Sequence, residues 1–140
     1  MVKEHGVKII FVDYLGLISA ERQDIPRWEQ MSEISRSLKA LARELAIPVI
    51  VLSQVSRDSE GKEPTLSNIR ESGAIEQDAD VVMFLHRDRN QEGENGDQVK
   101  VLPTKLIIAK QRNGPIGTVD IGFHRDYTWF TDSDHNERNR

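Results

Sequence analysis

The stretch that decides the fold is Val7–Ile18, VKIIFVDYLGLI, an apolar run interrupted at Asp13. Its first half, Val7–Val12, is rich in β-branched and apolar residues, which is typical of a strand covered on both faces, as in a parallel sheet. Asp13 then places a carboxylate at the carboxyl end of that strand. The stretch therefore predicts a buried parallel strand with an acidic side chain at the edge where open α/β sheets bind ligands.

A helix and a second strand are expected next. Asp24 and Pro26 predict the helix start, with the aspartate as cap and the proline in the first turn. Apolar residues then recur every three or four positions over about five turns and form one stripe: Trp28, Met31, Ile34, Leu38, Leu41 and Leu45. Pro48 ends the helix, and Val49–Leu52 predicts a second buried strand. This order predicts a right-handed parallel crossover.

The later part of the chain predicts a third strand followed by a hairpin. Ala79–Leu85 is apolar enough to be a buried strand, and Lys105–Ala109 and Thr118–Phe123 flank the turn-forming dipeptide Asn113-Gly114. Tyr127–Phe130 is expected to add an edge strand. The fold class is therefore α/β, a mixed sheet with parallel strands and a C-terminal antiparallel hairpin flanked by helices.

Composition limits the function classes. The 140 residues are expected to form one domain, residues 1–132, with a polar tail at 133–140 that frays. The chain has no cysteine, which excludes disulfides and cysteine–zinc sites and fits a cytoplasmic protein. We expect no membrane contact and no secretion. A net charge of −4 argues against a wholly basic nucleic-acid-binding surface, so any such contact must be local.

Two strand ends carry candidate site residues. Asp13 could hold a magnesium-bound water beside a triphosphate, or could simply be a turn-favouring residue. Gln54 follows the second strand and could hydrogen-bond a water and a phosphate oxygen, thereby sensing a γ-phosphate. Its alternative is a polar loop residue.

Two further motifs are charged. In RESGAIEQDAD, residues 70–80, Arg70 and the amide of Gly73 could contact a phosphate, although a solvated helix face is an equally good interpretation. A short helix is expected within Ser67–Asp78. Lys110 and Arg112 stand two apart before the hairpin tip, so on a strand they would address one anion together. The alternative is an ordinary basic turn.

The remaining candidates are structural. Trp28 and Met31 are expected in the core, and the four histidines show no metal-ligand spacing. The aromatic residues near the C-terminus could stack on a base, but packing at the sheet edge is favoured: Phe123, Tyr127, Trp129 and Phe130.

The order of these motifs is more specific than any one of them. FVDYLGLI, EISRSLKALARELAIPVIVLSQ, RESGAIEQDADVVMFLHRD and IIAKQRNGPIGTV, in that sequence, resemble the C-terminal half of the RecA-like ATPase domain of the bacterial replicative DNA helicases, the DnaB family. The resemblance covers nearly all of Gly6–Phe130. It implies a partial RecA-like P-loop NTPase core.

The resemblance also implies residue roles. Asp13 matches the Walker B aspartate, which holds Mg²⁺ through water, and Gln54 matches the glutamine sensor. Lys110 and Arg112 match the basic pair that reaches the neighbouring subunit's γ-phosphate, with Arg112 as the arginine finger. The loop that contacts single-stranded DNA is matched by Arg70, Glu71 and Gly73.

The implied activity is ATP-driven, Mg²⁺-dependent unwinding of duplex DNA at the replication fork. The implied assembly is a homohexameric ring on single-stranded DNA in the cytoplasm. Primase and a helicase loader would bind regions absent from this sequence. The chain departs from the family pattern at Gly16, Asn68 and His86, and its loop Ser56–Pro64 is short.

One motif of the family does not occur in the 140 residues. No glycine-rich phosphate loop ending in Gly-Lys-Ser or Gly-Lys-Thr is found, and the resemblance implies that this loop and the water-activating glutamate lie upstream. The isolated chain is therefore expected to hydrolyse no ATP. Two alternatives stay open on sequence alone: a RecA-like recombination or repair ATPase, and a non-catalytic fragment or binding module.

Overall fold

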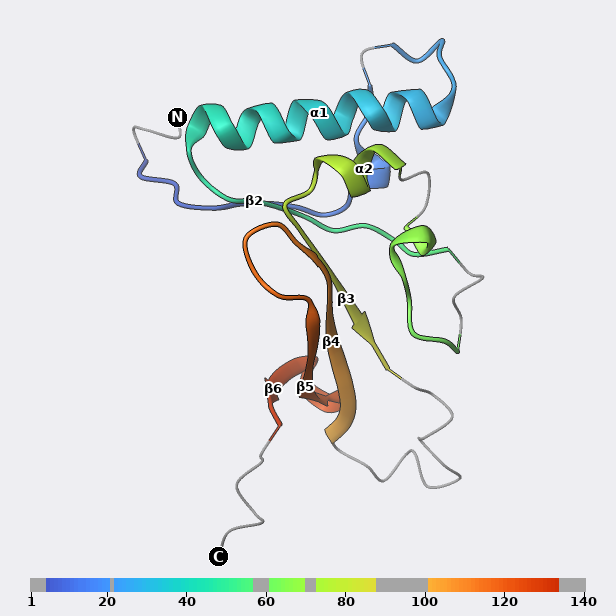
Figure 1. Cartoon of the computed structure of the whole chain (residues 1–140). Coiled ribbons are helices and arrows are strands. Elements are labelled where there is room, and N and C mark those ends of the chain that lie inside the picture. Colours follow the sequence, from blue (N-terminus) through green and yellow to red (C-terminus); the bar gives the residue numbers. More distant parts are fainter. Residues whose placement is uncertain (1–4, 21, 57–60, 70–72, 88–100, 134–140) are drawn as a thin grey trace, which may run out of the picture. The chain divides into compact units, whose positions relative to one another are not determined.

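The computed structural model describes residues 5–20, 22–56, 61–69, 73–87 and 101–133 (Figure 1). The chain divides into two compact units. The first unit comprises Met1–Asp58 and Leu66–Ala79, and the second comprises Ser59–Thr65 and Asp80–Arg140. The expected extent of one domain, residues 1–132, stays a prediction, and the tail beyond Ser133 lies outside the described residues.

The first unit is built on the expected strand–helix–strand order. β1 (Ile10–Val12) and β2 (Val49–Val51) pair in parallel, with Ile10 opposite Val49 and Val12 opposite Val51. The long helix α1 (Arg27–Leu45) connects them, as Figure 1 shows. The parallel pairing predicted from Val7–Val12 and Val49–Leu52 is therefore confirmed.

Two short helical elements complete this unit. The 3₁₀ helix η1 (Leu15–Leu17) follows β1 after Asp13 and Tyr14, and a second 3₁₀ turn, η3, spans Leu66–Asn68. The helix α2 (Gly73–Asp78) confirms the short helix expected in that region.

The ends of α1 differ in part from the prediction. The N-cap is Pro26 rather than Asp24, and no side chain caps the first turn. The side-chain amide of Gln30 instead donates to the carbonyl of Ile25 at 2.8 Å, which fastens the chain entering the helix. At the other end Ala46 adopts a left-handed conformation with φ of 52°, and its amide donates to the carbonyls of Ala42 and Arg43.

The core of the first unit lies under the middle of α1. Met31 and Ile34 are buried together with Leu15 and Ala20. Trp28, expected in this core, is 63% exposed. That prediction is wrong because the buried cluster begins only at Met31, one turn further along the helix. Polar pairing ties the short helix to the long one, since the Ser35 hydroxyl donates to the Asp78 carboxylate at 2.8 Å.

The second unit is a four-stranded antiparallel sheet in the order β3-β4-β5-β6. Its strands are β3 (Val81–His86), β4 (Val101–Gln111), β5 (Gly117–His124) and β6 (Trp129–Asp132). Asn113-Gly114 lies in the connection between β4 and β5, so the predicted hairpin is confirmed. The edge strand is confirmed too, two residues later than expected.

Aromatic packing at the edge is confirmed in part. The rings of Phe123 and Phe130 face each other across β5 and β6 with centroids 4.9 Å apart. Tyr127, in the 3₁₀ turn η5 (Arg125–Tyr127), is 77% exposed, and Trp129 of β6 is 64% exposed.

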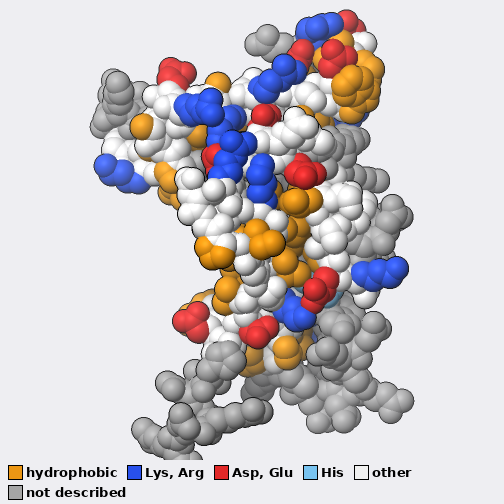
Figure 2. Space-filling view, viewed as in Figure 1, with side chains coloured by type: hydrophobic (Ala, Val, Ile, Leu, Met, Phe, Trp, Pro, Cys, Tyr) orange, Lys and Arg blue, Asp and Glu red, His pale blue; other side chains and the backbone are white. Residues whose placement is uncertain are grey.

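Burial of the strands on both faces is not observed. In β3, Phe84 is buried, whereas Val81, Met83 and Leu85 are exposed. Alternate side chains of a strand point to opposite faces, and the described part of the second unit has no α-helix to cover the second face. Phe11 of β1 is likewise 67% exposed. Figure 2 shows apolar side chains, in orange, at the surface.

None of the described helices combines the length and the apolar character that a membrane span needs.

Candidate functional site

Asp13 and Gln54 lie at the same edge of the parallel pair in the first unit. The pairing continues beyond the strands, since the Leu52 amide donates to the Val12 carbonyl at 2.9 Å. The Leu15 amide then donates to the Leu52 carbonyl at 2.8 Å. Both site residues are exposed. The structure therefore places Asp13 and Gln54 after neighbouring strand ends, where Gln54 lines a hollow and Asp13 does not.

A hollow of about 210 Å³ opens beside these strand ends. Its lining combines the turn after β1, the start of α1 and the end of β2: Tyr14, Leu15, Gly16, Arg27, Met31, Ser53 and Gln54. A guanidinium and an amide therefore share one small polar space.

Arg27 is the residue here that sequence analysis missed. Its Nη2 donates to the Gly16 carbonyl at 3.0 Å and its Nη1 to Gln30 Oε1 at 3.3 Å. The available signal was a cation in the first turn of a helix, where the helix dipole favours acidic residues instead. A cation placed against that preference suggests a specific partner.

The described residues that could bind Mg²⁺ suit contact with the ion through water. Among the described residues, no group of three or more His, Asp or Glu side chains could hold a metal ion. Mg²⁺ commonly keeps several waters and takes one or two carboxylates plus substrate phosphates. Asp13 therefore suits contact through water with an ion that a nucleotide also holds.

Lys110 and Arg112 lie at the hairpin of the second unit. Arg112 Nε lies 3.5 Å from Asp80 Oδ1, and both side chains are about half exposed. The expectation that both cations occupy a strand is wrong for Arg112, because β4 ends at Gln111 as the chain turns. The Arg112 amide still donates to the Asp80 carbonyl at 2.9 Å, so pairing extends one residue beyond the strand.

The expected DNA-contacting loop is described only at its end. Arg70 and Glu71 lie outside the described residues. Gly73 is the exposed first residue of α2, and a Cβ added there would meet nothing within 4 Å. Crowding therefore does not explain a glycine at this position.

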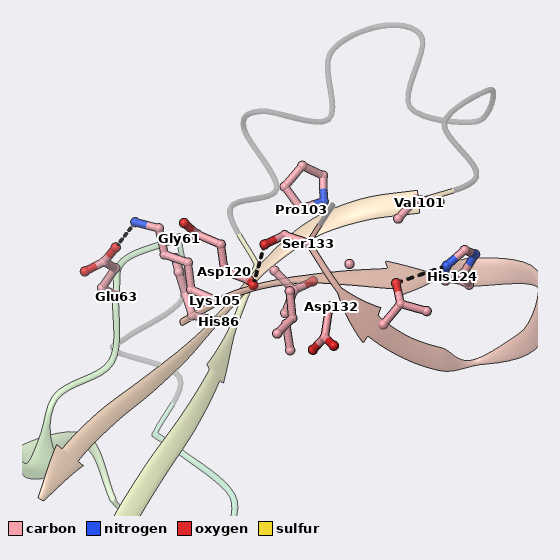
Figure 3. A pocket seen from close by; sticks show the side chains of 14 residues that line it. Gly61, Glu63, His86, Val101, Pro103, Lys105, Asp120, His124, Asp132 and Ser133 are labelled. Carbon is pink, nitrogen blue, oxygen red and sulfur yellow. Dashed lines mark hydrogen bonds and ion pairs between the residues drawn. The ribbon is translucent and has the colours of Figure 1, made fainter. Parts of the chain in front are cut away.

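A second hollow, of about 590 Å³, lies on the sheet of the second unit (Figure 3). Lys105 forms an ion pair and hydrogen bond with Glu63, which lowers the pKa of that carboxyl, with a smaller contribution from the charge of His86. His124 Nε2 lies 3.2 Å from Thr131 Oγ1, and the Ser133 hydroxyl donates to the Asp120 carbonyl. None of the predicted site residues lines this hollow.

Comparison with known protein families identifies the family to which this chain belongs. Residues 1–132 match the family described as "DnaB-like helicase C terminal domain". The chain belongs to this family.

The DnaB-like chain is similar to curated replicative helicases over part of their length. It is 60% identical over 127 residues to replicative DNA helicase DnaB of Treponema pallidum (strain Nichols), covering 91% of this chain and 27% of that protein. It is 52% identical over 134 residues to DnaB of Geobacillus stearothermophilus, covering 91% and 28%. The chain thus spans little more than a quarter of these relatives.

Solved structures agree with the DnaB-like assignment. A DnaB-like replicative helicase, described with its interactions with primase, matches with a TM-score of 0.79 at 43% identity, over 90% of this chain and 30% of that one. A solved ATPase domain matches with the same TM-score and identity, over 90% of this chain and 44% of that one. The predicted family and α/β fold are confirmed, and neither the recombination ATPase nor the separate binding module is favoured.

Proposed function

We propose that this chain is part of the motor of a replicative DNA helicase, and that the whole protein uses ATP and Mg²⁺ to unwind duplex DNA at the fork. The observation that carries the proposal is the common edge shared by Asp13 and Gln54. Ligands of open α/β sheets bind beyond the carboxyl ends of the strands. An acid and an amide at adjacent parallel ends suit a triphosphate and its metal.

Each of these residues has a distinct task. Mg²⁺, when bound, neutralises charge on the β- and γ-phosphates. The Asp13 carboxylate would hold the ion through its water shell. The Gln54 amide can donate to a phosphate oxygen while its carbonyl accepts from a water. Loss of the γ-phosphate would therefore change the hydrogen bonds of Gln54 at the end of β2.

Arg112, with Lys110, acts on a neighbouring subunit's γ-phosphate in a homohexamer. Its side chain is exposed, and an exposed ion pair such as that with Asp80 contributes little stability. The guanidinium can therefore exchange a carboxylate for a phosphate at small cost. Arginine suits this role because its planar fork matches phosphate oxygens.

The other partners follow from the same proposal. Arg70, Glu71 and Gly73 contact single-stranded DNA in the ring's channel, and primase and loader bind parts of the protein outside this sequence. The protein acts in the cytoplasm at the replication fork.

The test is Asp13→Ala in the full-length protein that carries this chain. We expect Mg²⁺-dependent ATP hydrolysis to fall about ten- to a hundredfold or more, because groups that position a metal's water shell have effects of that size. Asp24→Ala, which removes an exposed carboxylate away from the edge, is the matched control. Equal turnover in the two variants, measured by phosphate release, would refute the role of Asp13.

A further inference from the structure

We propose that Arg27 is a positioning residue that holds the turn after Asp13 and thereby sets the geometry of the Asp13–Gln54 edge. This inference rests on the proposed function. It assigns Arg27 a role through its bonds to the turn and not through a contact with the nucleotide.

Arg27 binds the carbonyl of Gly16, the middle residue of the 3₁₀ helix η1. Within η1, the Leu17 amide donates to the Tyr14 carbonyl and the Ile18 amide to the Leu15 carbonyl. The Gly16 carbonyl accepts from Arg27 Nη2 at 3.0 Å, across eleven residues of sequence. A charge-assisted bond of this kind is stronger than one between neutral groups.

The guanidinium is itself held in place. Its Nη1 donates to Gln30 Oε1, while Gln30 Nε2 donates to the Ile25 carbonyl. The planar fork of arginine makes both contacts at once, which the single ammonium of lysine does poorly. One helix turn is thus connected through Arg27 to the turn after β1.

The position of this turn affects the sheet edge at which Asp13 and Gln54 lie. It starts one residue after Asp13, and its residues Tyr14, Leu15 and Gly16 line the same hollow as Gln54. The Tyr14 ring lies across Gly16, where an added Cβ would come within 2.7 Å of the ring. Loss of the Arg27 bond would therefore release a closely packed segment that adjoins both site residues.

The test compares variants of the full-length protein. Arg27→Ala removes both donors, Arg27→Lys keeps the charge, and Arg36→Ala is the matched control. Arg36 lies on the same helix, but its bond runs only to the Ser32 carbonyl within that helix. Amide hydrogen exchange over residues 14–18 reports the turn directly, and kcat and KM for ATP report the site.

In Arg27→Ala we expect faster exchange over residues 14–18 and a kcat about tenfold lower. KM should stay within about twofold, because the proposed role of Arg27 is to position the turn and not to bind the nucleotide. Arg27→Lys should be intermediate in both readouts, and Arg36→Ala should match the unaltered protein.

Exchange and kcat in Arg27→Ala that match those of Arg36→Ala would overturn the inference. So would a loss of kcat with unchanged exchange over the turn. If Arg27→Ala fails to fold, Gln30→Ala, which removes the support of the guanidinium together with the bond to the Ile25 carbonyl, should show the same changes to a smaller degree, and their absence would also overturn it. An unaltered protein without ATPase activity would refute the proposed function, while the exchange data would still decide whether Arg27 holds the turn.

Discussion

On the proposed function, the exposed side chain of Arg112 is expected to control turnover while contributing little to stability. In the full-length protein, Arg112→Ala is expected to lower ATP turnover about 10³-fold or more, because a finger meets charge that develops in the transition state. Binding of a fluorescent ATP analogue should change little, since Asp13 and Gln54 belong to the subunit that holds the nucleotide.

Arg125→Ala is the matched control for this prediction, because Arg125 is an exposed arginine of the same unit. It should leave both turnover and binding unchanged. If Arg112→Ala instead weakened binding and turnover by the same factor, Arg112 would be a ground-state contact and not a finger acting across an interface.

Residues at strand ends were the ones that sequence could predict. Asp13 directly follows an apolar run and Gln54 follows one after Ser53, so their place at a sheet edge needs only the local pattern. Arg27 was missed because its acceptor is a backbone carbonyl in a 3₁₀ turn, and side-chain pattern gives no sign of that. The Arg112–Asp80 pair joins residues far apart in sequence through the register of β3 and β4, which local pattern does not fix.

At the scale of elements, residues of the apolar stripe of α1 differ in burial and should therefore differ in their contribution to stability. Met31→Ala should destabilise the protein by about 2–4 kcal/mol, because it empties a site that is only 2% exposed. Trp28→Ala removes a larger side chain from the same stripe, yet should cost less than about 1 kcal/mol, since Trp28 is 63% exposed. Urea unfolding followed by circular dichroism measures both, and a Trp28→Ala cost as large as that of Met31→Ala would contradict the division.

Periodicity and turn chemistry predicted α1 and the hairpin, but not the length of β4. Only Lys105–Ala109 was expected, whereas the strand runs over Val101–Gln111. Pro103 weakens the strand pattern because it lacks a backbone donor. Pro103 is accommodated because it lies opposite β5 alone. The pairing of β4 with β3 begins only at Lys105, so the missing backbone N–H of Pro103 leaves no gap in that pairing.

At the scale of the whole molecule, the apolar sequences of β1 and β3 do not match the exposure of these strands. The sequences of β1 and β3 are those of strands covered on both faces, but the described residues leave one face of each exposed. The curated relatives are more than three times as long as the aligned part. We therefore expect that the isolated chain, with these faces uncovered, self-associates at micromolar concentration, because exposed apolar faces and strand edges favour pairing.

Light scattering of the purified chain measures this self-association. Met83→Lys places a charge on the exposed face of β3 and should shift the chain toward the monomer. Thr118→Lys makes the same change in net charge at an exposed polar position of β5, and should leave the association as it is. Monomeric behaviour of the unaltered chain would mean that the exposed face needs no partner, and would favour an autonomous module.

Equal effects of Met83→Lys and Thr118→Lys would show that net charge, and not the apolar face of β3, controls the association.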